Sequence, residues 1–91
     1  MFQKISPQKV QHSDGYLVQV ADRYAVEYLD ENYVACIDVD FGETVGVYFR
    51  SLVVKNKSGD DIELSKDEYS KILERVVSGI EAMGSTVERI N

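Results

Sequence analysis

The most regular run of chemically active side chains is the segment CIDVDFGE, residues 36–43. Asp38 and Asp40 alternate there with apolar residues, and successive side chains of a β-strand point to opposite faces of the sheet. Both carboxylates therefore share one face with Cys36. Two carboxylates on one face could hold a hard cation, since Ca²⁺ and Mg²⁺ take oxygen ligands. With Glu27 from another strand they could also form an acid/base pair.

No second motif supports either chemistry. A calcium loop needs its acidic residues in a turn with a glycine, and these lie on an expected strand. A flat sheet face is also poorly suited to excluding water from a reaction. Carboxylates around Cys36 should raise its pKa and lower its reactivity, and the single histidine, His12, lies in the polar N-terminal segment. We therefore expect no enzymatic activity, no cofactor and no metal site.

The composition is that of one soluble globular domain. The chain has 91 residues, of which 44% are hydrophobic and 29% charged, a balance that favours a folded core over disorder. The first ten residues contain no continuous apolar stretch of the kind that a secretory signal carries. No run approaches the roughly 20 apolar residues of a membrane helix. A single cysteine fits a reducing compartment, so we expect a cytoplasmic protein without membrane contact.

The net charge of −6 is unevenly distributed. Residues 14–63 contain 11 acidic and four basic side chains, a net charge of −7, whereas the rest of the chain carries +1. Such acidity disfavours a phosphate backbone, because nucleic-acid affinity comes largely from Lys and Arg. It favours a basic protein partner, whose approach the electric field would accelerate.

Alternating hydrophobicity predicts an antiparallel meander of about five strands over residues 14–64, after a polar lead-in at residues 1–13. A further short strand at 9–12 could pair through the Asp14-Gly15 turn. Residues 45–55 form one long run that loses its alternation near Leu52, which predicts a bulge or burial on both faces. Another short strand is indicated at 62–64, and residues 85–91 are expected to form a short strand or a tail.

The clearest signal is an amphipathic helix over residues 65–84. Ser65 followed by Glu68 is typical of a capping box at the start of a helix, and Gly84 stands where a left-handed C-terminal cap belongs. Gly79 inside the helix costs about 1 kcal/mol relative to Ala, which indicates close packing against another element. The apolar stripe at helical spacing comprises Tyr69, Ile72, Leu73, Val76, Val77, Ile80 and Met83.

These elements predict an α+β fold in which the one C-terminal helix packs on one face of the sheet and leaves the other uncovered. The covered side is expected to carry Val18, Val20, Val26, Tyr28, Ile37, Val39, Phe41, Val47 and Phe49. The uncovered side is expected to carry Gln19, Glu27, Leu29, Cys36, Asp38, Asp40, Tyr48 and Arg50.

The junction IELSKDEYSKIL, residues 62–73, somewhat resembles the small coactivator family that binds single-stranded DNA and also places a helix after a four-stranded sheet. Stacking of bases on tyrosines would be the corresponding binding mode. The acidity of the sheet opposes it, because the sheet would repel a phosphate chain. The candidate tyrosines are Tyr16, Tyr24, Tyr28, Tyr33 and Tyr48.

Residues 24–84 resemble a family of small bacterial immunity proteins from polymorphic-toxin and contact-dependent inhibition systems. The turn YLDEN at 28–32, the strand at 34–39, the run VYFRSL at 47–52 and the loop SGDD at 58–61 carry the resemblance, together with the helix that ends at Gly84. It implies an acidic cytoplasmic protein that binds and neutralises one cognate toxin domain without chemistry of its own.

Our hypothesis is therefore an immunity protein that binds a basic toxin domain through an acidic sheet face. We assign the central contacts to Glu27, Asp38, Asp40, Tyr48 and Arg50, with Asp30, Glu31, Asp60 and Asp61 as peripheral loop charges. Tyr48 would supply buried contact area, and the carboxylates would speed association. The alternative is a structural or oligomerisation module in which this face or an open strand edge pairs with a second copy, as in a homodimer. A single-stranded nucleic-acid-binding domain is less favoured.

Overall fold

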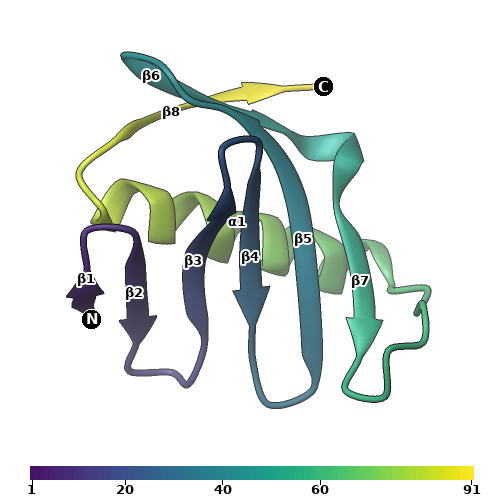
Figure 1. Cartoon of the computed structure of the whole chain (residues 1–91). Helices are drawn as coiled ribbons and strands as arrows, with labels where there is room; N and C mark the ends of the chain where they lie inside the picture. The colour runs from purple at the N-terminus through teal and green to yellow at the C-terminus, as the bar shows by residue number, and fades with distance from the viewer.

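One curled sheet contains all eight strands, in the order β1-β2-β3-β4-β5-β6-β8, with β7 also paired to β5 (Figure 1). The computed structural model describes all 91 residues. The strands are β1 (Phe2–Ser6), β2 (Lys9–His12), β3 (Leu17–Asp22), β4 (Ala25–Leu29), β5 (Tyr33–Asp40), β6 (Thr44–Tyr48), β7 (Val53–Asn56) and β8 (Thr86–Ile90), and the helices are the 3₁₀ turn η1 (Phe49–Ser51) and α1 (Lys66–Ala82).

The predicted α+β class, the mainly antiparallel sheet and the single C-terminal helix on one face are confirmed, but eight strands exceed the predicted five. Residues 1–13 form the β1–β2 hairpin rather than a polar lead-in, because Val10 is fully buried opposite Val18 of β3. Residues 86–90 form β8, which pairs with β6 in parallel. A parallel strand needs a long crossover connection, and α1 supplies one.

The run 45–55 is two strands separated by η1, rather than one bulged strand. Both β6 and β7 pair along the same side of β5: β6 with residues 39 and 40, and β7 with residues 33–36. The chain must therefore turn tightly at η1, between the end of β6 and the start of β7. Ser51 secures that turn, because its Oγ accepts from the Asp38 N–H at 2.8 Å and donates to the Tyr48 carbonyl at 2.6 Å. Residues 62–64 form no strand, although Asp61 makes an isolated bridge to Lys55.

The helix starts and stops where its sequence signals predict. Ser65 is the N-cap, and its Oγ accepts from the Glu68 N–H at 3.2 Å. The Glu68 carboxylate, however, accepts from the Ser65 hydroxyl at 3.2 Å and from the Tyr33 hydroxyl at 3.0 Å. Gly84 has a φ of 101°, the left-handed conformation of a C-terminal cap. The helix therefore takes its ends from local chemistry.

The core lies between α1 and one face of the sheet (Figure 1). Gly79 allows α1 to pack closely against β3, because a Cβ at this position would lie 2.5 Å from Cγ2 of Val18. Phe41 differs from the prediction: it follows the last residue of β5 and is 42% exposed instead of buried. The single α-helix is not long and apolar enough to cross a membrane. The buried strand residues include Val10, Val18, Val26, Tyr28, Ala35, Ile37, Val39, Val45, Val47 and Val54.

Candidate functional site: an acidic and aromatic corner of the sheet

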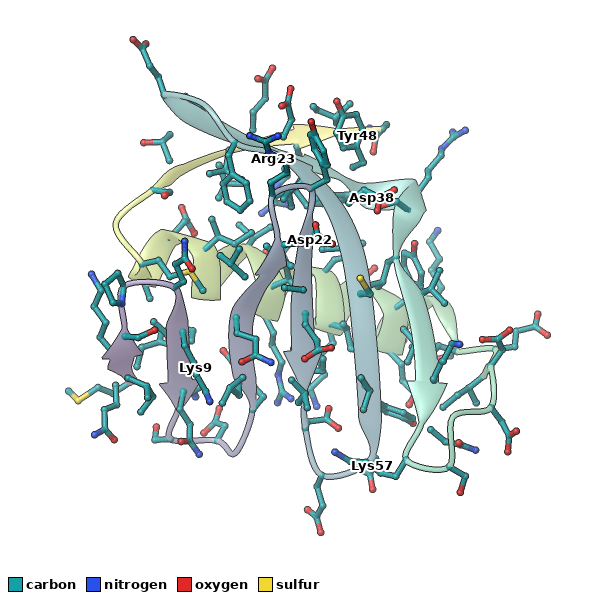
Figure 2. All side chains as sticks on the ribbon, viewed as in Figure 1. Lys9, Asp22, Arg23, Asp38, Tyr48 and Lys57 are labelled. Atoms are coloured by element: carbon teal, nitrogen blue, oxygen red, sulfur yellow. The ribbon has the colours of Figure 1, made fainter.

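An open hollow of about 540 Å³ lies where the β3–β4 turn meets β5 and β6. We call it the tyrosine–aspartate hollow; its lining is Tyr24, Asp38, Val39, Asp40 and Tyr48. Figure 2 shows Asp38 and Tyr48 in this corner of the sheet, whereas Lys57 lies at the opposite end. Three separate elements therefore supply the polar and aromatic groups of one surface feature.

Strand register sets the direction of these side chains. Val39 is buried and pairs with buried Val47, so Asp38 and Asp40 on β5 and Tyr48 on β6 point to the outward side. The Val39 N–H donates to the Tyr24 carbonyl at 2.8 Å, which holds the β3–β4 turn against β5. The hollow is thus built on a hydrogen-bonded scaffold.

The aromatic and acidic groups of the hollow have few partners within the molecule. Tyr24 is 63% and Tyr48 is 40% exposed, whereas Tyr16 and Tyr28 are buried in the core. The carboxylates of Asp38 and Asp40 form none of the four ion pairs of the structure. This corner therefore presents two free negative charges beside two accessible aromatic surfaces.

The outward face of the sheet continues from the hollow along β3, β4 and β5; we call it the open face. Glu27 lies in its centre and accepts from Gln19 Nε2 at 2.6 Å. Partial burial, together with the carboxylates of Asp38, Glu27 and Asp22, raises the pKa of the Cys36 thiol. The predicted position of Cys36 among carboxylates is confirmed. An apolar row, Leu17–Leu29–Val34, crosses the same face and is half-buried.

The structure brings together only part of the predicted site. Glu27, Asp38, Asp40 and Tyr48 share the outward side of the sheet, and Arg50 lies nearby on η1, exposed and outside the hollow. The four remaining predicted residues lie elsewhere: Asp30 and Glu31 in the β4–β5 turn, and Asp60 and Asp61 in the loop after β7, where Asp61 is 3.9 Å from Lys55.

Asp30 belongs to a hydrogen-bonded cluster on the helix side of the sheet. Its carboxylate accepts from the Tyr28 hydroxyl at 2.6 Å, and Arg75 Nη1 donates to that hydroxyl at 3.0 Å while lying 4.0 Å from Asp30. The guanidinium also stacks over the Tyr16 ring, 4.5 Å from its centre. Although burial alone would raise the pKa of Asp30, the bonds from Tyr28 and from the N–H groups of residues 32 and 33 lower it.

This cluster borders a second cavity, of about 270 Å³, at the first turns of α1. Its central charged groups, Arg75 and Asp30, are engaged with Tyr28 and with each other. Sequence reasoning overlooked the cluster. A signal for it exists, because Arg75 borders the apolar stripe of the helix beside Ile72, where a charged residue that becomes buried needs a partner.

The sequence pointed to Tyr24 only as one of five tyrosines that could stack on bases, and its place in this hollow was not predicted. The available signal was the Asp22-Arg23 turn directly before it, which ends β3 and in which the Tyr24 N–H donates to Asp22 Oδ1 at 2.8 Å. His12, the single histidine, lies in β2 with its ring stacked on Tyr16 at 4.7 Å. Its Nδ1 accepts from the Asp14 N–H at 2.9 Å. The histidine thus belongs to an aromatic cluster.

Comparison with known protein families, curated proteins and solved structures finds no match to this chain.

Proposed function

We propose that this chain is a non-enzymatic immunity protein that binds a basic toxin domain through the tyrosine–aspartate hollow and the adjoining open face. The observation that carries the proposal is the pairing of free carboxylates, Asp38 and Asp40, with the exposed rings of Tyr24 and Tyr48. Exposed aromatic residues at the centre of a patch and charges around it are typical of protein interfaces.

The chemistry of the corner selects the sign of the partner's charge. Four acidic side chains lie on or beside the outward side of the sheet, in the hollow and the adjoining open face: Asp22, Glu27, Asp38 and Asp40. Their field accelerates the approach of a basic surface and opposes an acidic one. The tyrosines contribute contact area with little loss of conformational entropy on binding.

The toxin class of the partner is supported by the resemblance of residues 24–84 to small immunity proteins and by the net charge of −6. A toxin domain that acts on nucleic acid carries a basic groove for phosphates. Occupying that groove with carboxylates would block the substrate and would require no reaction in the immunity protein.

The test is capture of the partner with two forms of the protein. Tagged wild type and the double variant Asp38→Lys/Asp40→Lys are each incubated with lysate of the native cell, and retained proteins are identified by mass spectrometry. We expect wild type to retain a toxin or its C-terminal domain and to neutralise the purified domain. The variant should bind it at least about tenfold more weakly, since charge reversal at an interface costs several kcal/mol.

Asp60→Lys/Asp61→Lys is the matched control, because it changes the net charge equally at a loop outside the hollow. It should lower affinity much less. An equal loss of affinity in both variants would indicate that the protein binds through its overall charge, and would contradict the assignment of the contact to this face. Failure of wild type to retain any toxin, with the toxin shown to be expressed, would contradict the proposed function.

A second candidate function, self-association, is favoured by the apolar row Leu17–Leu29–Val34 and by Val53, which is 50% exposed on the same face. Two copies could bury these rows against each other. Sedimentation equilibrium of the pure protein separates the two candidates: a concentration-dependent dimer that Leu29→Lys abolishes favours self-association, whereas a monomer at all concentrations excludes it.

A further inference from the structure

We propose that the tyrosine–aspartate hollow is a receptor for a single arginine side chain of the partner, with the guanidinium lying between Tyr24 and Tyr48 and bonded to Asp38 and Asp40. The inference rests on the proposed function and names the group that the partner must present. It follows from the geometry of the hollow and from the groups that line it.

The two carboxylates are spaced to share one cation. Asp38 and Asp40 are separated by one residue on the same strand face, so their backbone positions lie about 7 Å apart. A guanidinium is planar and carries five N–H donors, enough to bond both carboxylates at once. The compact ammonium group of a lysine is less suited to bonding both carboxylates at once.

The rings supply the second half of the recognition. Cations are attracted to the faces of tyrosine rings within about 6 Å of the ring centre. The chain itself contains this arrangement at the edge of the hollow, because the guanidinium carbon of Arg23 lies 5.8 Å from the centre of the Tyr24 ring. Arg23 lines a neighbouring hollow with Phe41 rather than this one. The Tyr48 ring has no such partner.

The contrast with the helix-side cavity strengthens the assignment. There, Arg75 already lies over the Tyr16 ring and within 4.0 Å of Asp30, so one arginine of the chain satisfies the aromatic and acidic groups together. In the tyrosine–aspartate hollow, Arg23 lies over Tyr24 but forms no ion pair with Asp38 or Asp40, and the Tyr48 ring has no cation partner. The missing member of the set is an arginine supplied from outside.

The experiment titrates isotope-labelled full-length protein with N-acetyl-arginine N-methylamide and follows the backbone amides by NMR. We expect weak, saturable shifts concentrated at Tyr24, Asp38, Val39, Asp40 and Tyr48. The citrulline analogue, which has the same shape without the charge, should cause none. Shifts of equal size at Asp60 and Asp61 would mean diffuse attraction to acidic surface, and either that pattern or the absence of shifts would overturn the proposal.

Substitutions at Tyr48 test whether the aromatic ring, rather than apolar volume alone, contributes to binding of the arginine probe. Tyr48→Phe keeps the aromatic face and should leave the probe affinity within about twofold, whereas Tyr48→Leu keeps apolar area only and should weaken it about fivefold or more. Arg23→Gln removes a like charge at the edge of the hollow and should strengthen binding about twofold. Equal affinity of the Phe and Leu variants would exclude a role for the ring. Arg23 and Tyr48 are both exposed, and circular dichroism verifies that the variants fold.

The same variants keep this inference distinct from the proposed function. If the toxin domain binds Tyr48→Leu and wild type equally but loses affinity for Asp38→Lys/Asp40→Lys, the partner binds the acidic face and the arginine receptor is wrong. If the arginine probe occupies the hollow and no toxin domain binds, the receptor stands and the toxin partner is wrong.

Discussion

At the scale of single residues, we expect alanine to be tolerated at one crowded glycine, Gly46, and to destabilise the fold at another, Gly79. A Cβ at Gly79 would lie 2.5 to 2.9 Å from three atoms of Val18, a β-branched side chain that is fully buried in β3. A Cβ at Gly46 would meet Cδ1 of Ile90 at 2.8 Å, the end of a flexible side chain on an edge strand. Steric cost depends on whether the neighbour can move.

We therefore expect Gly79→Ala to lower the free energy of unfolding by about 1–3 kcal/mol, although alanine is the better helix former. Gly46→Ala should cost less than about 1 kcal/mol, because Ile90 can change rotamer. Urea denaturation of both variants measures the difference. A Gly79→Ala protein as stable as wild type would show that α1 and β3 can separate without loss, against the packing described here.

Asp30 makes stability depend on pH. Its pKa is lower in the folded protein than in the unfolded chain, so the carboxylate stabilises the fold above its ordinary pKa of about 4 and loses that effect as the pH falls through the lowered value. Asp30→Asn should be less stable than wild type by about 1–3 kcal/mol near neutral pH, and the gap should narrow in acid. Denaturation curves across this range measure it. A gap independent of pH would contradict the assignment.

At the scale of elements, α1 depends on its N-cap. Ser65→Ala removes the acceptor of the Glu68 N–H and should lower the free energy of unfolding by about 1 kcal/mol. Ser70→Ala, an exposed position one turn further along the helix, should have no destabilising effect because alanine favours helix. Thermal unfolding of the two variants gives the comparison. Equal stability of both would mean that Ser65 does not cap the helix in solution.

The elements also differ in how far local sequence predicts them. The helix ends depend on Ser65 and Gly84, neighbours of the segment that they terminate, and both were predicted. The division of residues 45–55 into β6, η1 and β7 depends on β5, with which both strands pair. A bulge and a strand switch disturb alternation alike, so the pattern around Leu52 could not distinguish them. The parallel β6–β8 pair depends on where α1 delivers the chain.

At the scale of the whole molecule, the charge distribution predicts how binding responds to salt. Because the acidity is concentrated in residues 14–63, attraction to a basic domain acts mainly before contact. Raising the salt concentration to about 0.5 M should slow association by an order of magnitude or more and change dissociation little. Stopped-flow mixing with the proposed toxin domain measures both rates. Salt that changes only the dissociation rate would contradict electrostatic steering.

The sequence by itself determined the class of the fold, the helix with its caps, the need for close packing at Gly79 and the shared outward direction of Asp38 and Asp40. Each of these depends on neighbours in the chain or on the two-residue period of a strand. The tertiary structure decided the rest. It placed Tyr24 beside Asp38 through the β3–β4 turn, directed Asp30 to Tyr28 and Arg75, and exposed Phe41. These arrangements join residues from different elements, and strand pairing and helix packing, which no local pattern encodes, bring them together.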